Sequence, residues 1–221
     1  MQIMQTEDQQ LVGLKEYFVK YRRLALIVIA VLLAVIVAGR YWQHHKLVRA
    51  AAASDLYEEM LIADHRQDLN TLTAKGNLLV KSYSSTPYGQ FAGMLLAKQA
   101  VNEGHLEQAE QLLRTVIGRR KSSNMSLHVA TVRLAKVLMQ QGKIDEALTL
   151  VAAGPGKGAE AYATIYEEAK GDLYVAKGDT KLAKESYINA LKALPDGAAE
   201  AQFVQLLQLK LLDLGVGEND A

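Results

Sequence analysis

The sequence predicts an all-α protein in which one transmembrane helix near the N-terminus precedes a solenoid of about three helix pairs with flanking helices. Ala and Leu dominate the 221 residues, only three prolines occur, and the β-branched alternation of strands is missing outside one apolar run. That apolar run, residues 24–39, is the second observation. The third is a glycine-to-alanine pattern that recurs after 38 and then 36 residues. With half of its residues apolar, the chain can form one anchored domain with a sizeable core.

The apolar run is long enough to cross a membrane once its flanks are included. It reads LALIVIAVLLAVIVAG, without a charged or hydrogen-bonding side chain. As a helix it covers about 24 Å of a hydrocarbon core about 30 Å thick, and the aromatic and basic flanks make up the difference. We therefore expect a transmembrane helix over residues 21–42. The residues assigned to its two ends are Tyr21, Arg22, Arg23, Leu24, Gly39, Arg40, Tyr41 and Trp42.

Two other interpretations of this run fit less well. Burial in a soluble core would require apolar neighbours on all sides, and no other segment is apolar enough. A cleaved signal peptide would have a short apolar region followed closely by a small-residue cleavage site. Here the preceding segment contains three acids, the bulky Arg40, Tyr41 and Trp42 follow, and the nearest Ala-x-Ala lies at residues 51–53. The span is therefore expected to stay uncut in the bilayer.

The charges suggest an orientation and exclude one class of partner. Four basic residues precede the span within twenty positions and three follow it, so the positive-inside rule leans towards a cytoplasmic segment over residues 1–20. Residues 46–221 carry 20 basic and 21 acidic side chains. Such a nearly neutral domain cannot collect the phosphate contacts that nucleic-acid binding needs. The absence of cysteine excludes disulfides, thiolate nucleophiles and Cys-ligated zinc.

Beyond the span, three segments share one spacing, a glycine followed five residues later by an alanine. The three pairs are Gly104 with Ala109, Gly142 with Ala147, and Gly178 with Ala183. The third copy is the fullest, and its further matching positions are Gly171, Tyr174, Tyr187, Ala190 and Pro195. This small-small-large pattern, at a period close to 34 residues, is typical of tetratricopeptide repeats. We expect each copy to be a pair of antiparallel helices.

Each position of the repeat has a physical role. The glycines can adopt positive φ and so end the first helix of a pair. An acidic residue then lies near the start of the second helix, where the helix dipole favours negative charge. The alanine lets the two helices approach, and a larger side chain fills the space one turn further on. The acidic residues are Glu107, Asp145 and Asp179, and the larger side chains are Leu113, Val151 and Tyr187.

The other segments are assigned around these pairs. We expect connecting helices over residues 43–86, the repeats over residues 87–197, and a capping helix and tail over residues 198–221, because a solenoid must cover its last open face. The chain before about Gln9 and after Gly215 is expected to be loose.

Finer expectations concern the connecting region and the last helix. A helix over residues 67–83 should be followed by a turn over residues 84–89, and residues 154–158 should form a loop. The side chains expected to point inward from the first helix are Leu69, Leu72, Leu79 and Val80. The capping-helix side chains are Phe203, Leu206, Leu207, Leu209, Lys210, Leu211 and Leu214.

The residues that could carry chemistry do not combine into a site. The five histidines are His44, His45, His65, His105 and His128. The first two lack a carboxylate on the following helical turn, the fourth follows a turn glycine, and the other two are isolated. Residues 154–158 lack the flanking residues of a phosphate-binding loop. The basic triplet at residues 119–121 suits a helix C-terminus, with a lipid- or partner-binding patch as the alternative. We expect no cofactor, metal or enzymatic activity.

The concave face of the solenoid is the expected binding surface. In such a superhelix the first helix of each pair lines the concave side, where extended partners lie. Counting from the turn glycines gives Met94, Lys98, Val101, Val132, Lys136, Met139, Glu168, Asp172 and Val175. Core packing between repeats is an equally good explanation for the Val and Met positions. The basic pairs of a carboxylate clamp for chaperone tails are largely absent.

Several segments, taken in order, resemble the YfgM-like ancillary subunits of the SecYEG translocon. They are the polar stretch from Val12 to Phe18, the Gly-Arg-Tyr-Trp boundary after the span, Tyr88-Gly-x-x-Ala92, and the third repeat's Gly171-x-x-Tyr174-x-x-Lys-Gly178-Asp179. The similarity covers nearly the whole chain. No catalytic residues belong to that family, which agrees with the search for chemistry.

The resemblance implies a place in the cell and a set of partners. It implies a bacterial inner-membrane protein with a cytoplasmic N-terminus and a periplasmic repeat domain. It further implies that this protein associates with SecYEG and with the periplasmic chaperone PpiD, and that it assists proteins emerging from the channel. The family also suggests a response regulator, RcsB, as a partner of the N-terminus. An envelope-assembly adaptor for cell-wall or outer-membrane proteins is the alternative, and an enzyme with an unrecognised site is the third.

Overall fold

The computed structural model describes residues 4–118, 124–154, 160–194 and 201–215, and all regular secondary structure in these ranges is helical. The elements are α1 (Met4–His65), α2 (Leu69–Ser82), α3 (Pro87–Asn102), α4 (Leu106–Ile117), α5 (Asn124–Gln140), α6 (Ile144–Ala152), the short 3₁₀ turn η1 (Glu160–Tyr162), α7 (Ala163–Lys177), α8 (Thr180–Lys192) and α9 (Ala201–Asp213). Contacts divide the chain into two units, Met1–Ala51 and Ala52–Ala221. The predicted all-α class is confirmed.

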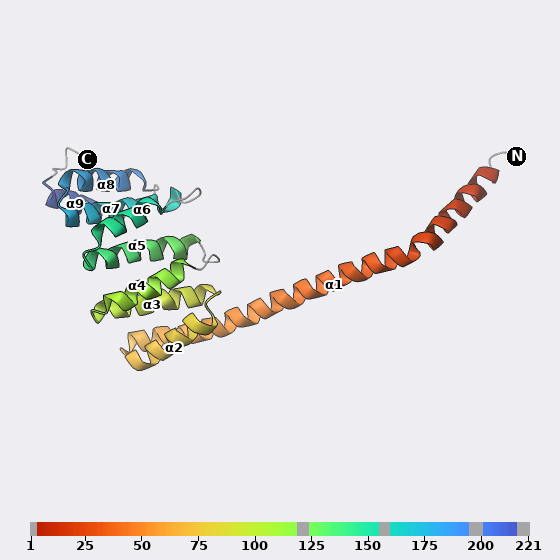
Figure 1. Ribbon diagram of the computed structural model, residues 1–221, viewed down its shortest axis with the longest axis horizontal. Helices are drawn as coiled ribbons and strands as arrows, with labels where there is room; N and C mark the ends of the chain where they lie inside the picture. The colour runs from red at the N-terminus through yellow and green to blue at the C-terminus, as the bar shows by residue number, and fades with distance from the viewer. Residues whose placement is uncertain (1–3, 119–123, 155–159, 195–200, 216–221) are drawn as a thin grey trace. The chain divides into compact units, whose positions relative to one another are not determined.

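The first unit is the N-terminal part of α1, drawn from red to orange in Figure 1. All eight residues assigned to the ends of the span lie in this one uninterrupted helix. Its described part contains one stretch that is long and apolar enough to cross a membrane, and no residue of the apolar window is buried. The expectation of a loose N-terminus up to Gln9 is wrong, because α1 begins at Met4.

One contact supports an interfacial role for the end of the span. The Lys46 ammonium lies 3.7 Å from the centroid of the Trp42 ring, one helical turn away. A cation over an aromatic face suits the headgroup region, where the ring stays amphipathic and the lysine stem covers apolar surface.

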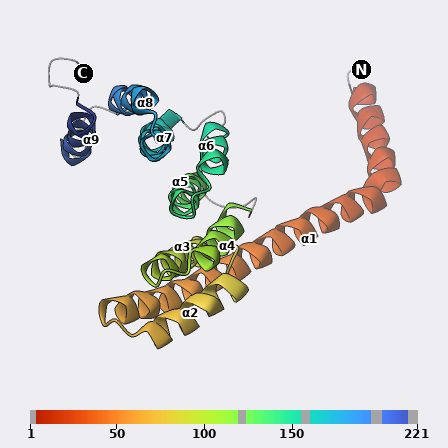
Figure 2. The ribbon, with the colours of Figure 1, turned by 60° about the vertical axis from the view of Figure 1, so that its left-hand side comes forward.

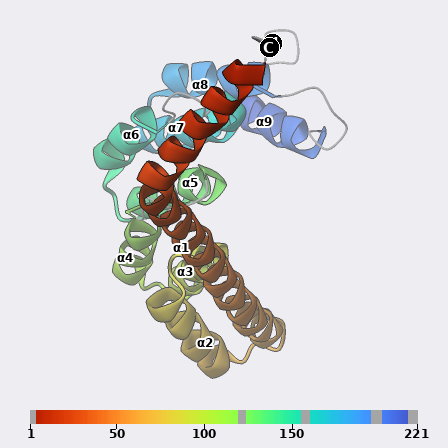
Figure 3. The same ribbon diagram turned by 90° about the vertical axis from the view of Figure 1, so that its right-hand side faces the viewer.

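The second unit is a series of helix pairs. After residues 52–65 of α1 and α2 come α3/α4, α5/α6 and α7/α8, with α9 last (Figures 1 and 2). In Figure 3, α4 and α6 lie on one side of α3, α5 and α7, while α9 lies on the other. The first helices of the three pairs, α3, α5 and α7, lie in one row, which we call the inner row, and α8 lies above α7 in this view.

The three turn glycines end the first helices as expected. Gly104 and Gly142 have φ of 77°, and Gly178 has φ of 84°. In each case the following amide N–H donates to a carbonyl five residues back, for example His105 to Ala100 at 2.8 Å. This is the Schellman arrangement, which satisfies carbonyls that the helix end leaves unpaired. A side chain at these positions would be strained, because L-residues rarely adopt positive φ.

Small residues set how closely paired helices approach. Ala109, Ala147 and Ala183 are completely buried, so each gives its partner helix a flat contact. The approach of the two helices is tightest at Gly171, because a Cβ atom there would lie 2.2 Å from Cε1 of the Tyr187 ring. The third pair therefore packs a large ring directly on a bare stretch of helix backbone.

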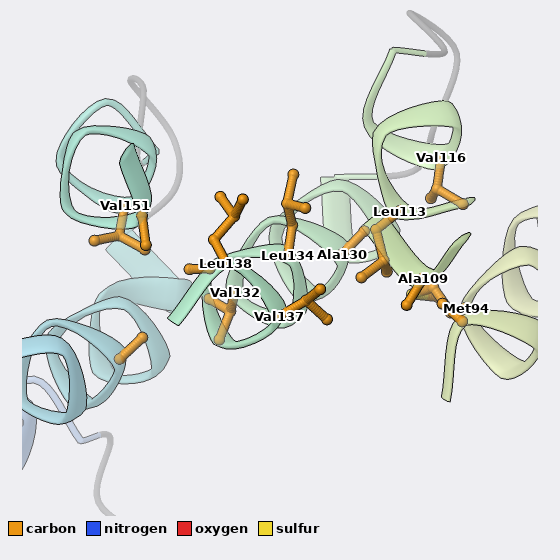
Figure 4. Packing of buried hydrophobic residues seen from close by; sticks show 14 of the residues in the cluster. Met94, Ala109, Leu113, Val116, Ala130, Val132, Leu134, Val137, Leu138 and Val151 are labelled. Atoms are coloured by element: carbon orange, nitrogen blue, oxygen red, sulfur yellow. The ribbon is translucent and has the colours of Figure 1, made fainter. Parts of the chain in front are cut away.

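The main core cluster runs through the first two pairs and into the third. It joins Leu113 and Val116 of α4 with Leu134 and Leu138 of α5. Figure 4 shows these side chains spread along the cluster, with Leu113 and Val116 towards Met94 and Leu138 towards Val151. Each repeat thus buries its apolar surface against its neighbours. A second cluster joins the end of α1 to α2 and α3, and a third joins α8 to α9.

The capping of two helices explains why α2 and α3 begin at other residues than the sequence predicts. Pro87 occupies the first turn of α3, and the Thr86 hydroxyl accepts a hydrogen bond from the Gly89 amide at 3.2 Å. The turn expected over residues 84–89 therefore ends at Thr86, since proline is well suited to the first helical turn. Asp68 caps α2 in the same way, through the Thr71 amide at 3.1 Å.

Some expected core positions are exposed. Leu69 is 44% exposed because it is the first residue of α2, whereas Leu72 and Leu79 are fully buried. In α9, Leu207 and Leu211 are buried but Leu206 and Leu209 are exposed. The capping helix therefore keeps an apolar outer stripe. Pro195, the basic triplet at 119–121 and the loop beyond Gly154 lie outside the described residues.

Ion pairs between α4 and α6 hold the first two repeats together on their outer side. The Glu110 carboxylate accepts from Arg114 Nε at 2.8 Å and from Lys143 Nζ at 3.0 Å, and Arg114 also reaches Glu146 at 2.5 Å. Hydrogen bonds from the Arg114 guanidinium, then from Lys143, lower the pKa of Glu110 to about 2. Networks of this kind contribute more than isolated surface pairs.

The Gly171 contact gives a direct test of the packing. Gly171→Ala should lower the free energy of unfolding by about 1–3 kcal/mol, because overpacking outweighs alanine's better helix propensity. Urea unfolding of the full chain in lipid nanodiscs, followed by circular dichroism, measures the change. In a Tyr187→Leu background, which removes the ring, the same substitution should cost clearly less. Equal costs in both backgrounds would show that the ring does not set the helix spacing.

Candidate protein-binding groove on the inner helices

A groove lies along the inner helices, between the end of α1, α3 and α5. It contains two hollows of about 270 Å³ and 400 Å³. Met94, Lys98 and Arg133 line both hollows, so the two form one continuous depression. The larger one lies within the roughly 300–1,000 Å³ that binding pockets usually have.

Most of the lining is apolar. The smaller hollow has a floor of buried side chains from α3, α4 and α5, which are Met94, Ala97, Leu113 and Val137. The larger hollow is walled by Tyr57, Phe91, Leu95, Met125 and Val129. Met125 is 51% exposed at the rim. Methionine adapts its shape easily, which is typical of surfaces that accept varied partners.

An aromatic cluster closes one end of the groove. The Tyr57 ring of α1 lies 5.8 Å from Tyr88 and 6.0 Å from Phe91, centroid to centroid, at tilted angles. Burial raises the pKa of Tyr57, although the positive charge of Arg133 opposes this. The ring therefore stays neutral and offers an apolar face to the groove.

The charges that line the groove are positive. Lys98 and Arg133 are exposed, and neither has a carboxylate within 4.0 Å among the described residues. None of the described residues that line the two hollows is Asp or Glu. The groove thus combines an apolar floor with two cationic side chains at its rim.

A charge network adjoins the groove and joins the inner helices α5 and α7 to α9. Lys136 of α5 lies 3.2 Å from Glu168 and 3.5 Å from Asp172, both of α7. Lys210 of α9 reaches the same two carboxylates at 2.5 Å each. The Tyr187 hydroxyl of α8 donates to Asp172 at 2.8 Å. Two carboxylates are thus matched by two ammonium groups.

The network keeps Asp172 and Lys210 charged although both are largely buried. Burial would raise the pKa of Asp172, but hydrogen bonds from Lys210 and Tyr187 outweigh it, so the pKa lies below its ordinary value. Burial likewise opposes charge on Lys210, yet Asp172 and Glu168 keep its pKa above the ordinary value. The pKa of Tyr187 is raised by burial and then by Asp172. Glu168 is 5% exposed, which makes this network part of the core and not a free surface.

Known proteins that are similar in sequence to this chain agree with the helical-repeat architecture. The family described as "Tetratricopeptide repeat-like domain" covers residues 15–216. A relative from Haemophilus influenzae, named ancillary SecYEG translocon subunit, is 31% identical over 186 residues, which is 83% of this chain and 88% of the relative. The chain belongs to the family of ancillary SecYEG translocon subunits.

Two further relatives of the same name extend the match. The one from Aggregatibacter actinomycetemcomitans is 27% identical over 200 residues, or 90% of this chain and 95% of its own length. The one from Escherichia coli K12 is 24% identical over 216 residues, or 98% of this chain and its entire length. The family resemblance seen in the sequence is therefore confirmed across the span and the repeats together.

In this chain the expected concave-face residues fall into four groups. Met94, Lys98, Val101 and Lys136 line the groove. Val132 and Met139 belong to or pack on the main core cluster. Glu168 and Asp172 are engaged in the charge network, and Val175 is exposed near the end of α7.

The sequence reasoning placed neither Arg133 nor Tyr57 in the groove, and it gave Lys210 only as a capping-helix side chain. Arg133 lies one turn before Lys136 on the same helix, so the spacing could have revealed it. Tyr57 comes from α1, outside the repeats, and no local signal connects it to the groove. Lys210 stands among leucines in the last helix, and a lone lysine in such a run could have been recognised as a partner for buried carboxylates.

His128 is also not isolated, contrary to the sequence-based expectation. Its ring stacks on Tyr162 at 4.2 Å, and its Nδ1 lies 3.0 Å from the Tyr166 hydroxyl. Burial lowers the pKa of this histidine, so it is neutral near pH 7. His44, His45, His65 and His105 are exposed. Within the described residues no three His, Asp or Glu side chains gather as a metal site would require.

The network predicts a stability change that depends on pH. Lys210→Met should lower the free energy of unfolding by about 1.5–3 kcal/mol near pH 7, because two buried carboxylates lose a charged donor. Because the pKa of Asp172 is lowered in the folded protein, its carboxylate stabilises the fold at pH values above the ordinary Asp pKa. This stabilisation is lost progressively as the pH falls from the ordinary pKa through the lowered one. The variant should therefore lose less stability than the wild type on acidification. Urea unfolding at several pH values measures both effects.

A matched control uses a lysine outside the network. Lys192→Met, at the exposed end of α8, should leave the stability within about 0.5 kcal/mol of the wild type at each pH. If both variants unfold at the same urea concentration, the network does not stabilise the inner helices.

Proposed function

We propose that this chain is a membrane-anchored, protein-binding subunit of the SecYEG translocon. Its repeat domain lies on the periplasmic side, where it links the channel to a periplasmic chaperone such as PpiD and assists exported proteins. One observation carries the proposal. A member of this family combines an exposed helix of membrane-spanning length with a repeat unit that has an open, apolar groove. The chain acts by binding, and no catalytic role is proposed.

The orientation follows from charge and family together. Residues 1–20 face the cytoplasm, the span occupies residues 21–42 of the inner membrane, and the groove faces the emerging chain. Positive charge before the span supports this orientation. On the cytoplasmic side, a response regulator is the partner that family membership suggests.

The anchor contributes through effective concentration. A binding domain tethered beside its partner meets it at a local concentration near the millimolar range, so weak contacts suffice. This accounts for a groove with few strong polar contacts in a protein that must release many different chains. An anchored domain of this kind can act repeatedly without leaving the channel.

Co-purification tests the proposal. The full chain with a C-terminal tag, isolated from gently solubilised inner membranes, should recover the three channel subunits and a periplasmic chaperone. Protease added to spheroplasts should digest the repeat domain, because that domain is exposed outside the membrane. A control with the same repeat domain behind a cleavable signal should recover much less channel, since it lacks the anchor.

Two results would contradict the proposal. Recovery of cell-wall or outer-membrane assembly proteins in place of channel subunits would favour the envelope-assembly adaptor. A soluble mature chain that begins near Ala53 would show that the apolar segment is a signal peptide and not an anchor.

A further inference from the structure

The groove has a charge character that its occupant must match. Lys98 and Arg133 stand at the rim of both hollows, and the described lining offers them no carboxylate. The neighbouring Lys136 differs, because Glu168 and Asp172 already neutralise it. The unbalanced charge of the groove is therefore about two positive units, both between α3 and α5.

The apolar lining restricts the occupant further. Met94 and Leu113 are almost fully buried at the floor, so an occupant's apolar side chains would reach the hydrophobic core. At the other end, the Tyr57 and Phe91 rings, which line the larger hollow, provide a second apolar contact. A phosphate or a nucleic-acid backbone would leave these surfaces unused, and two cations are too few to hold it.

The length of the groove indicates an extended chain. Neighbouring packed helices lie roughly 9 Å apart, so the way from α1 across α3 to α5 is about 18–20 Å. An extended peptide rises about 3.3 Å per residue, so about six residues fill that distance. Alternate side chains of such a peptide point to the same face, which fits two apolar hollows separated by a charged rim.

We propose that the groove between α1, α3 and α5 binds an extended segment of another polypeptide, about six residues long, whose apolar side chains enter the two hollows and whose carboxylates pair with Lys98 and Arg133. This inference rests on the proposed function, because it names the kind of chain that the anchored subunit holds. The segment is an apolar stretch with one or two Asp or Glu residues, as it occurs in a polypeptide that has not yet folded.

Peptide binding to the wild-type chain provides the first test. The full chain is placed in phosphatidylcholine nanodiscs, and a fluorescein-labelled peptide Gly-Leu-Glu-Leu-Leu-Glu-Leu-Gly is titrated by anisotropy, with empty nanodiscs subtracted. Matched peptides carry Gln or Lys in place of both Glu residues. The Glu peptide should bind about tenfold more tightly than the Lys peptide, with Gln between them. The preference should shrink between 0.05 M and 0.5 M NaCl, because exposed charges are screened.

Charge reversal locates the site. Lys98→Glu combined with Arg133→Glu should invert the order, so that the Lys peptide binds best. The matched control, Lys181→Glu with Lys192→Glu, adds the same charge on exposed positions of α8 and should keep the wild-type order. A third variant, Met94→Ala, should weaken all three peptides alike, because it removes an apolar contact and no charge.

The inference is overturned if the wild type shows no preference among the three peptides, a result that needs no variant to fold. It is also overturned if the α8 control removes the preference as fully as the groove variant does. Either result leaves the proposed function standing as long as the channel still co-purifies with the full chain. Failure of that co-purification would remove the proposed function, whatever the peptides do.

Discussion

The close approach of helices at residues with little or no side chain is the constraint on which the repeat unit depends. Gly171 lies directly against the Tyr187 ring, and Ala109, Ala147 and Ala183 are completely buried at the equivalent contacts. In the first two pairs the larger side chains Leu113 and Val151 belong to the main core cluster, whereas in the third pair the Tyr187 ring packs on its own partner helix.

The turns make this packing possible. A helix that must reverse within a few residues needs a backbone conformation that only glycine adopts without strain, and Gly104, Gly142 and Gly178 supply it. In each pair the second helix begins two residues after the turn glycine. The chemistry of the groove depends on which side chains the inner helices present.

The two ends of the inner row differ in a way that bears on function. Between α3 and α5 the cations Lys98 and Arg133 have no acidic partner in the described lining, whereas from α5 to α9 the carboxylates and lysines satisfy one another. Buried pairs of this kind specify an arrangement more than they add stability. The second half of the row is therefore closed by its own contacts, and the first half remains available to a partner.

Much of this architecture could be predicted from the sequence because its determinants are local. The apolar run shows its length directly, and the glycine-to-alanine spacing shows where each helix pair turns. The limits of prediction arise where contacts depend on distant residues. His128 looks isolated because Tyr162 stacks on it and Tyr166 meets it edge to face only after folding, and Lys210 joins α7 from the far end of the chain.

Helix periodicity alone also fails to predict which residues are buried where leucine occurs on every side of a helix. In α9 the pattern cannot tell buried Leu207 from exposed Leu209, since both have leucine neighbours one turn away. Counting from the turn glycines reached Met94, Lys98 and Lys136, which line the smaller hollow of the groove. The same counting missed Tyr57, which belongs to α1, because the repeat pattern does not extend to that helix.

The central claim is that the inner face between α3 and α5 meets polypeptides that leave the channel. Photocrosslinking in living cells tests it most directly, with a photoreactive amino acid placed at Met125, on the groove rim, or at Lys192, on α8 outside the groove. With an exported protein stalled in the channel, the account predicts adducts with that protein from position 125 and few from position 192. Equal adducts from both positions, or adducts from position 192 alone, would contradict it.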